Sequence, residues 1–189
     1  MNVPQINKKS TGRLETRNVM QKPKIGRIYL DLDGVIANFE KRYIELFREA
    51  PGSARDRKEF SKNWKTFIEG KNFETLDWWP GGPELISYIQ KNFPHESVEI
   101  LTSSGGNKYH SEVEVQKNMW IKTMNLSEKW KVNVVAGRKL KAEFATPDSV
   151  LIDDTLDVIE AFNAAGGIGI HHKDYGNTIM LLDILLAKD

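Results

Sequence analysis

Short apolar runs alternate with amphipathic segments of helical period along most of this chain, and no other feature of the sequence restricts the fold as strongly. Alternation of this kind predicts a mostly parallel sheet that is covered by helices on both faces. We therefore expect an α/β fold with a five-stranded sheet. The expected strands span residues 25–32, 98–101, 132–136, 150–152 and 168–170.

Polar side chains follow three of the expected strands, at the point where each strand ends. They are Asp31, Asp33, Thr102, Ser103, Asp153 and Asp154. In open parallel sheets, ligand sites lie beyond the carboxyl ends of the strands. The sequence therefore predicts one polar site at this edge of the sheet.

The first of these groups has the spacing of a metal site. Asp31 and Asp33 follow the apolar run 28–30, and strand alternation places both carboxylates on the same side. Gly34 then allows a sharp turn without a steric penalty. Two carboxylates held together favour a hard cation such as Mg²⁺, with one carboxylate free to act as a nucleophile. The alternative is a solvated turn after an edge strand.

The composition excludes several other kinds of site. The chain has no cysteine, which removes disulfides, thiolate catalysis and thiolate zinc sites. Its formal net charge of +1 argues against stable binding to nucleic acid or to a membrane surface. Residues 1–24 are polar and basic, lack the apolar core of a secretory signal, and are expected to form a flexible tail. We expect a soluble, cytoplasmic protein.

Four pieces of the sequence, in this order, resemble the haloacid dehalogenase (HAD) superfamily of phosphotransferases. They are Asp31-x-Asp33-Gly34-Val35, the strand that ends in Thr102, a lysine in the basic segment 138–141, and Leu151-Ile152-Asp153-Asp154. The resemblance extends from residue 25 to residue 172. It implies a Rossmann-like core at 25–37 and 80–189, with a small helical cap at 38–79.

The resemblance also implies catalytic roles. Asp31 would attack phosphorus and form an aspartyl-phosphate, while Asp33 would protonate the leaving alkoxide and later activate water. Thr102, helped by Ser103, would hold a phosphoryl oxygen. Asp31, the main-chain carbonyl of Asp33, and the pair Asp153 and Asp154 would hold Mg²⁺.

A lysine would neutralise phosphate charge in this arrangement, and the basic segment offers two. Lys141 is closer to the pattern of the family because Phe144 and Ala145 follow it. Lys139 is the alternative. Either lysine could instead be a solvated surface charge.

A narrower resemblance is to the 5′(3′)-deoxyribonucleotidases, a family of 5′-nucleotidases. It is carried by Asp33-Gly34-Val35-Ile36-Ala37-Asn38-Phe39, Pro80-Gly81-Gly82-Pro83-Glu84, Leu151-Ile152-Asp153-Asp154 and Ala165-Gly166-Gly167-Ile168-Gly169-Ile170. In that family, an aromatic residue at the place of Phe39 and aromatic residues of the cap line the nucleoside pocket. Trp64 and Phe67 could supply such a surface here, although an aromatic stripe on a helix is more often core packing.

Together, the two resemblances imply a Mg²⁺-dependent phosphomonoester hydrolase that acts on a nucleoside monophosphate. Two alternatives remain open, a 3′-phosphatase acting on nucleic-acid ends and a non-catalytic binding or regulatory protein with the same fold. The sequence gives no prediction of the oligomeric state.

Overall fold

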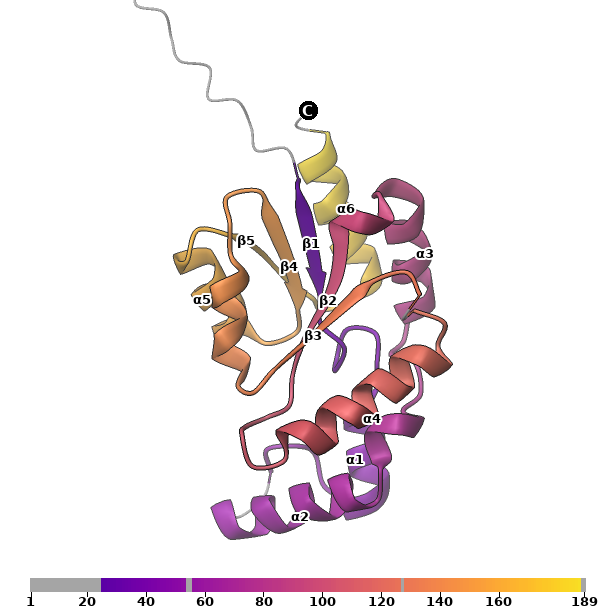
Figure 1. Ribbon diagram of the computed structural model, residues 1–189, viewed down its shortest axis with the longest axis vertical. Coiled ribbons are helices and arrows are strands. Elements are labelled where there is room, and N and C mark those ends of the chain that lie inside the picture. The colour runs from indigo at the N-terminus through magenta and orange to yellow at the C-terminus, as the bar shows by residue number, and fades with distance from the viewer. Residues whose placement is uncertain (1–24, 54–55, 127, 188–189) are drawn as a thin grey trace, which may run out of the picture.

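A parallel sheet of five strands forms the centre of the computed structural model, which describes residues 25–53, 56–126 and 128–187. The strand order is β3-β2-β1-β4-β5 (Figure 1). The strands are β1 (Arg27–Leu30), β2 (Val98–Ser103), β3 (Lys131–Val135), β4 (Ser149–Asp153) and β5 (Ile168–His171). All pairings are parallel, which confirms the predicted fold class. The expected tail at residues 1–24 lies outside the described residues.

The first strand is shorter than the sequence predicted, because β1 ends at Leu30 rather than at Leu32. The carbonyl oxygen of Leu32 accepts hydrogen bonds from the N–H groups of Ile36 and Ala37, so the chain has already turned at this point. Gly34 has a φ of 74°, a left-handed conformation that glycine adopts without penalty. The turn directs the chain away from the sheet directly after the two aspartates.

Helices cover both faces of the sheet (Figure 1). The helices α3 (Gly82–Asn92), α4 (His110–Thr123) and α6 (Tyr175–Leu186) pack on one face. The other face carries α5 (Leu156–Ala164) and the 3₁₀ helix η3 (Arg138–Phe144), while η2 (His95–Ser97) precedes β2. No helix among the described residues is long and apolar enough to cross a membrane.

Alternate residues of the central strands pack into separate cores. Ile28 and Leu30 belong to the cluster under α3, α4 and α6, whereas Tyr29 contacts the cluster under α5. In β4, Ile152 and Leu151 divide between the two clusters in the same way. Burying one such aliphatic side chain contributes about 1.5–3 kcal/mol. The alternating side chains of the strands therefore pack against the helices on both faces of the sheet, and the polar residues that follow the strands remain at one edge.

A group of helices follows the first strand, in the segment where the sequence analysis expected a cap, and is called the cap below. It consists of α1 (Phe39–Phe47), α2 (Arg57–Glu69) and the 3₁₀ helix η1 (Asn72–Thr75). The chain enters and leaves the cap through two paired segments, since Ala37 and Trp78 form an antiparallel bridge. The cap therefore begins and ends beside the edge of the sheet where Asp31 and Asp33 lie.

Two side chains of α4 hold the cap against the core. Gln116 donates from Nε2 to the carbonyl oxygen of Ile68 at 2.8 Å, and the indole N–H of Trp120 donates to Leu76 at 2.8 Å. Both donors are buried. Breaking such a bond leaves a buried polar group unpaired, which costs about 1–3 kcal/mol.

Candidate active site

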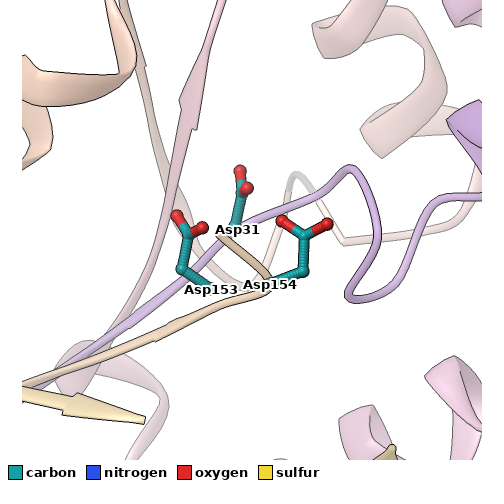
Figure 2. A group of neighbouring side chains, drawn as sticks. All are labelled: Asp31, Asp153 and Asp154. Carbon is teal, nitrogen blue, oxygen red and sulfur yellow. The ribbon is translucent and has the colours of Figure 1, made fainter. Parts of the chain in front are cut away.

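Three carboxylates meet where β1 and β4 end. Asp31 follows β1, Asp153 ends β4, and Asp154 is the next residue. Their ligand oxygens all lie within 4.8 Å of one another, and Figure 2 shows the carboxylates gathered around a common space. Asp31 and Asp153 are buried, whereas Asp154 is exposed. A Cβ at Gly34 would lie only 2.2 Å from Oδ2 of Asp154, so this close approach requires glycine.

Burial and, after it, mutual repulsion raise the pKa of two of these carboxyl groups. Desolvation, followed by the charges of Asp31 and Asp153, raises the pKa of Asp154 to about 7. Burial and the charge of Asp31 likewise raise the pKa of Asp153. A cation between the three groups would relieve this repulsion, and an all-oxygen donor set suits Mg²⁺. The donors present thus fit the metal that the sequence predicted.

Lys141 lies buried beside two of these carboxylates. Its ammonium is 2.9 Å from Oδ1 of Asp31 and 2.6 Å from Oδ2 of Asp153. Burial alone would lower the pKa of Lys141, but the attraction of Asp31 and Asp153 outweighs it and raises that pKa. Lys139, the alternative, is exposed on the same 3₁₀ helix. The structure therefore places Lys141 at the cluster and leaves Lys139 on the surface.

Asp33 has a separate cationic partner. Its Oδ2 accepts a hydrogen bond of 2.6 Å from Nζ of Lys117, on α4. Burial raises the pKa of Asp33, and the charge of Lys117 partly opposes this rise. The carboxylate of Asp33 therefore lies outside the metal-type cluster, although Asp33 and Asp31 line the same cavity.

Sequence reasoning missed Lys117, although the sequence contains a signal for it. Val113, Trp120 and Ile121 define the buried face of α4, and Lys117 falls on that face by helical spacing. A lysine among buried apolar positions needs a partner, because an unpaired buried charge is costly. Its position therefore indicated a buried ion pair.

A cavity of about 640 Å³ joins these groups. Asp31, Asp33, Thr102, Ser103, Lys141 and Asp154 line its polar side. The predicted aromatic residues Phe39 and Trp64 also line it, together with Phe60 and Trp79, which were not predicted as site residues. The structure thus brings the predicted residues to one cavity, with Asp153 buried behind it.

Phe39 and Trp64 have different surroundings. The ring of Phe39 packs 5.1 Å from that of Phe67 and 5.8 Å from that of Phe73, so much of it belongs to the core of the cap. Trp64 stacks on the exposed Phe60 at 6.0 Å, and a Cβ at Gly105 would lie 2.8 Å from its ring. Trp64 therefore forms the cavity wall where the cap approaches the loop after β2.

No sequence profile of a known protein family matches the chain, and no curated protein sequence does. Solved structures do resemble it. A hydrolase from Streptococcus pneumoniae superposes with a TM-score of 0.50 at 16% identity, over 85% of this chain and 99% of that one.

Two other solved structures are less similar. An uncharacterized protein from Corynebacterium glutamicum has a TM-score of 0.42 at 14% identity, over 86% of this chain and 96% of its own. The HAD domain of the effector protein Lem4 from Legionella pneumophila has a TM-score of 0.39 at 14% identity, over 88% of this chain and 99% of its own. Scores this low have no bearing on the fold. The chain thus shares its α/β fold, over most of its length, with a bacterial hydrolase.

Proposed function

We propose that this protein is a Mg²⁺-dependent phosphomonoester hydrolase of the HAD type, acting through an aspartyl-phosphate on Asp31. The observation that supports it is the meeting of Asp31, Asp33, Thr102, Lys141 and Asp154 around one cavity. These are the groups that such a reaction needs: a nucleophile, a proton donor, a phosphate-binding hydroxyl, a cation and a metal ligand.

The proposed first step transfers the phosphoryl group to the enzyme. An oxygen of Asp31 forms a bond to phosphorus as the bond to the leaving-group oxygen breaks, and Asp33 gives its proton to that oxygen. The Thr102 hydroxyl donates to a phosphoryl oxygen, and Lys141 lowers the repulsion between Asp31 and the phosphate. When bound by Asp31, Asp153 and Asp154, Mg²⁺ supplies further positive charge against the phosphoryl oxygens.

The proposed second step restores the enzyme. Asp33, now a carboxylate, removes a proton from water as the water oxygen attacks phosphorus. The bond between phosphorus and the Asp31 oxygen breaks, releasing inorganic phosphate. Asp33 again carries a proton, so the cycle closes without another reactant.

The proposed substrate is a nucleoside monophosphate, which would make the protein a 5′-nucleotidase. The support is the apolar wall of Phe39, Phe60 and Trp64 beside the polar end of the cavity. An aromatic wall at this position could stack on a base while the phosphate lies against Asp31.

The test is a hydrolysis screen with Mg²⁺ over nucleoside 5′- and 3′-monophosphates, sugar phosphates and 3′-phosphorylated oligonucleotides. We expect phosphate release to be highest with a 5′-monophosphate and to disappear with a chelator. Release from the oligonucleotide alone would instead favour the 3′-phosphatase. No release from any substrate would overturn the phosphatase proposal.

Asp31→Asn provides the matched control for the screen. It removes the attacking charge at nearly constant size, so hydrolysis should fall to background while the fold, checked by circular dichroism, is retained. Hydrolysis at the parental rate by this variant would rule out the covalent mechanism.

A further inference from the structure

Lys117 uses all of its hydrogen-bonding capacity on protein atoms. Its ammonium donates to Oδ2 of Asp33 at 2.6 Å, to Oγ1 of Thr102 at 2.8 Å and to the carbonyl oxygen of Ser103 at 2.8 Å. A lysine ammonium has three N–H donors. The side chain is 2% exposed, and all three acceptors belong to residues that line the cavity. Lys117 therefore has no N–H group left to bind a substrate directly.

These bonds leave one oxygen of Asp33 free. Its Oδ2 is held by Lys117, while Oδ1 is buried and has no hydrogen-bond partner among the residues that the structure describes. A buried carboxylate oxygen without a partner is costly, so such an atom calls for an explanation. The Lys117 bond restricts the orientation of the Asp33 carboxyl group, and Oδ1 is left without a partner among the described residues.

The same ammonium also orients Thr102. Because Oγ1 of Thr102 accepts the bond from Lys117, the hydroxyl proton of Thr102 remains available to donate. Thr102 lines the cavity, so this proton can reach a bound anion. One buried ammonium thus arranges a proton-transfer group and a hydrogen-bond donor on the same wall.

We propose that Lys117 is a positioning residue, which holds the carboxyl group of Asp33 in place for proton transfer to the leaving-group oxygen, and which turns the Thr102 hydroxyl toward the phosphoryl group. The inference rests on the proposed phosphatase function. It gives the two buried lysines different tasks: Lys141 contacts Asp31 and lines the cavity, whereas Lys117 acts through Asp33 and Thr102.

The dependence on the leaving group separates this role from a merely structural one. Phenyl phosphate and p-nitrophenyl phosphate are close in shape, but phenolate is the more basic leaving group and needs the proton more. The measured quantity is the ratio of kcat/KM for phenyl phosphate to kcat/KM for p-nitrophenyl phosphate. Misplacing Asp33 should lower this ratio, whereas partial unfolding or loss of the Thr102 contact lowers both values by a common factor.

We expect Lys117→Met to lower the ratio about tenfold or more, given that general acid–base catalysis contributes about 10²–10⁴-fold. Lys117→Arg keeps a cation and should retain part of the ratio. Lys122→Met, an exposed lysine of the same helix, is the control and should leave both kcat/KM values unchanged.

Adding Lys117→Met to a variant that lacks the Asp33 proton donor provides a second test, which is needed if Lys117→Met is poorly stable. In Asp33→Asn the proton donor is already absent, so adding Lys117→Met should not lower the ratio further. A parental ratio in Lys117→Met, or a further fall in the Asp33→Asn background, would overturn the positioning role. Absence of turnover in the parental enzyme would instead overturn the phosphatase function, and the inference with it.

Discussion

At the scale of single residues, each of the two carboxylates in the proposed mechanism has its own buried ammonium. Lys141 pairs with Asp31, and Lys117 pairs with Asp33. Each lysine side chain is 2% exposed, so each ion pair lies in a medium that screens charge far less than water does. The repulsion that would otherwise separate Asp31 from Asp33 is therefore opposed locally, before any metal or substrate is considered.

The residue-scale prediction compares two lysines of one 3₁₀ helix. Lys141→Met should lower kcat/KM by about 100-fold or more, because it removes a preorganised cation from Asp31, the proposed nucleophile. Lys139→Met removes an exposed charge of the same type and should change kcat/KM by about twofold at most. Steady-state kinetics with a nucleoside monophosphate checks both. Equal losses in the two variants would contradict the assignment of Lys141.

The sequence identifies the aspartates of the site more readily than the lysines that pair with them. Asp31 and Asp33 can be recognised as site residues from the local sequence, because they follow an apolar strand at alternate positions. The pair Asp153 and Asp154 can be recognised in the same way. The partner of Asp33 is different, because Lys117 comes from a helix 84 residues further along the chain. Such a contact depends on how α4 docks on the sheet, and local periodicity does not determine docking.

At the scale of elements, the aromatic residues on one face of α2 have two different roles: one packs in the core of the cap and another lines the cavity. Phe67 is fully buried and contacts Phe39, Tyr43 and Phe73, so it belongs to the core of the cap. Trp64, less than one turn away, lines the cavity. Sequence spacing places both on one helix face, but only the packing of α1 and η1 decides which ring is covered.

The element-scale prediction concerns recognition of the base. Losing a stacking contact costs about 1–3 kcal/mol, so Trp64→Ala should raise KM for a nucleotide by roughly 5- to 150-fold. Hydrolysis of p-nitrophenyl phosphate offers little to stack and should change much less. Steady-state kinetics on both substrates measures the difference.

Phe47→Ala is the control for this prediction. Its ring packs on Tyr43 at 4.6 Å within the cap, so the variant should lower thermal stability without changing the preference between the two substrates. An equal loss on both substrates in a folded Trp64→Ala protein would reject a base-stacking role. Phe39→Ala is less informative, since its ring also supports the cap core.

At the scale of the whole molecule, the strand order explains why the acidic groups meet. The sheet places β4 directly beside β1, in parallel register from Arg27 opposite Ser149 to Leu30 opposite Ile152. Asp31 and Asp153 therefore emerge side by side, although 122 positions separate them in the sequence. The sequence predicts five parallel strands from their alternation with helices. Tertiary packing decides which strands are adjacent, so hydrophobic periodicity alone could not predict that β4 lies beside β1.

The whole-molecule prediction is a pH dependence of metal binding. The pKa of Asp154 is raised to about 7, so its carboxylate is mostly protonated below that pH in the metal-free protein. Mg²⁺ must displace this proton, and its affinity should therefore rise with pH by up to about tenfold per unit below pH 7 and level off above it. Calorimetric titration with Mg²⁺ from about pH 5.5 to about pH 8.5 measures this dependence.

Asp154→Asn is the matched variant for the titration. It should bind Mg²⁺ more weakly and show a flatter pH dependence, because the amide has no proton to lose in this range. A parental affinity that stays constant from acidic to basic pH would show that Asp154 does not hold the ion.

The hydrogen bonds from Gln116 and Trp120 to the cap also affect how a substrate arrives. A lid that swings on a hinge must give up its contacts at each turnover, and here two buried bonds and the aromatic packing behind them would have to break. The cavity is already open to the outside, with Asp154 exposed at its wall. We therefore expect the width of the cavity mouth, rather than a movement of the cap, to limit the size of the leaving group that the proposed phosphatase accepts.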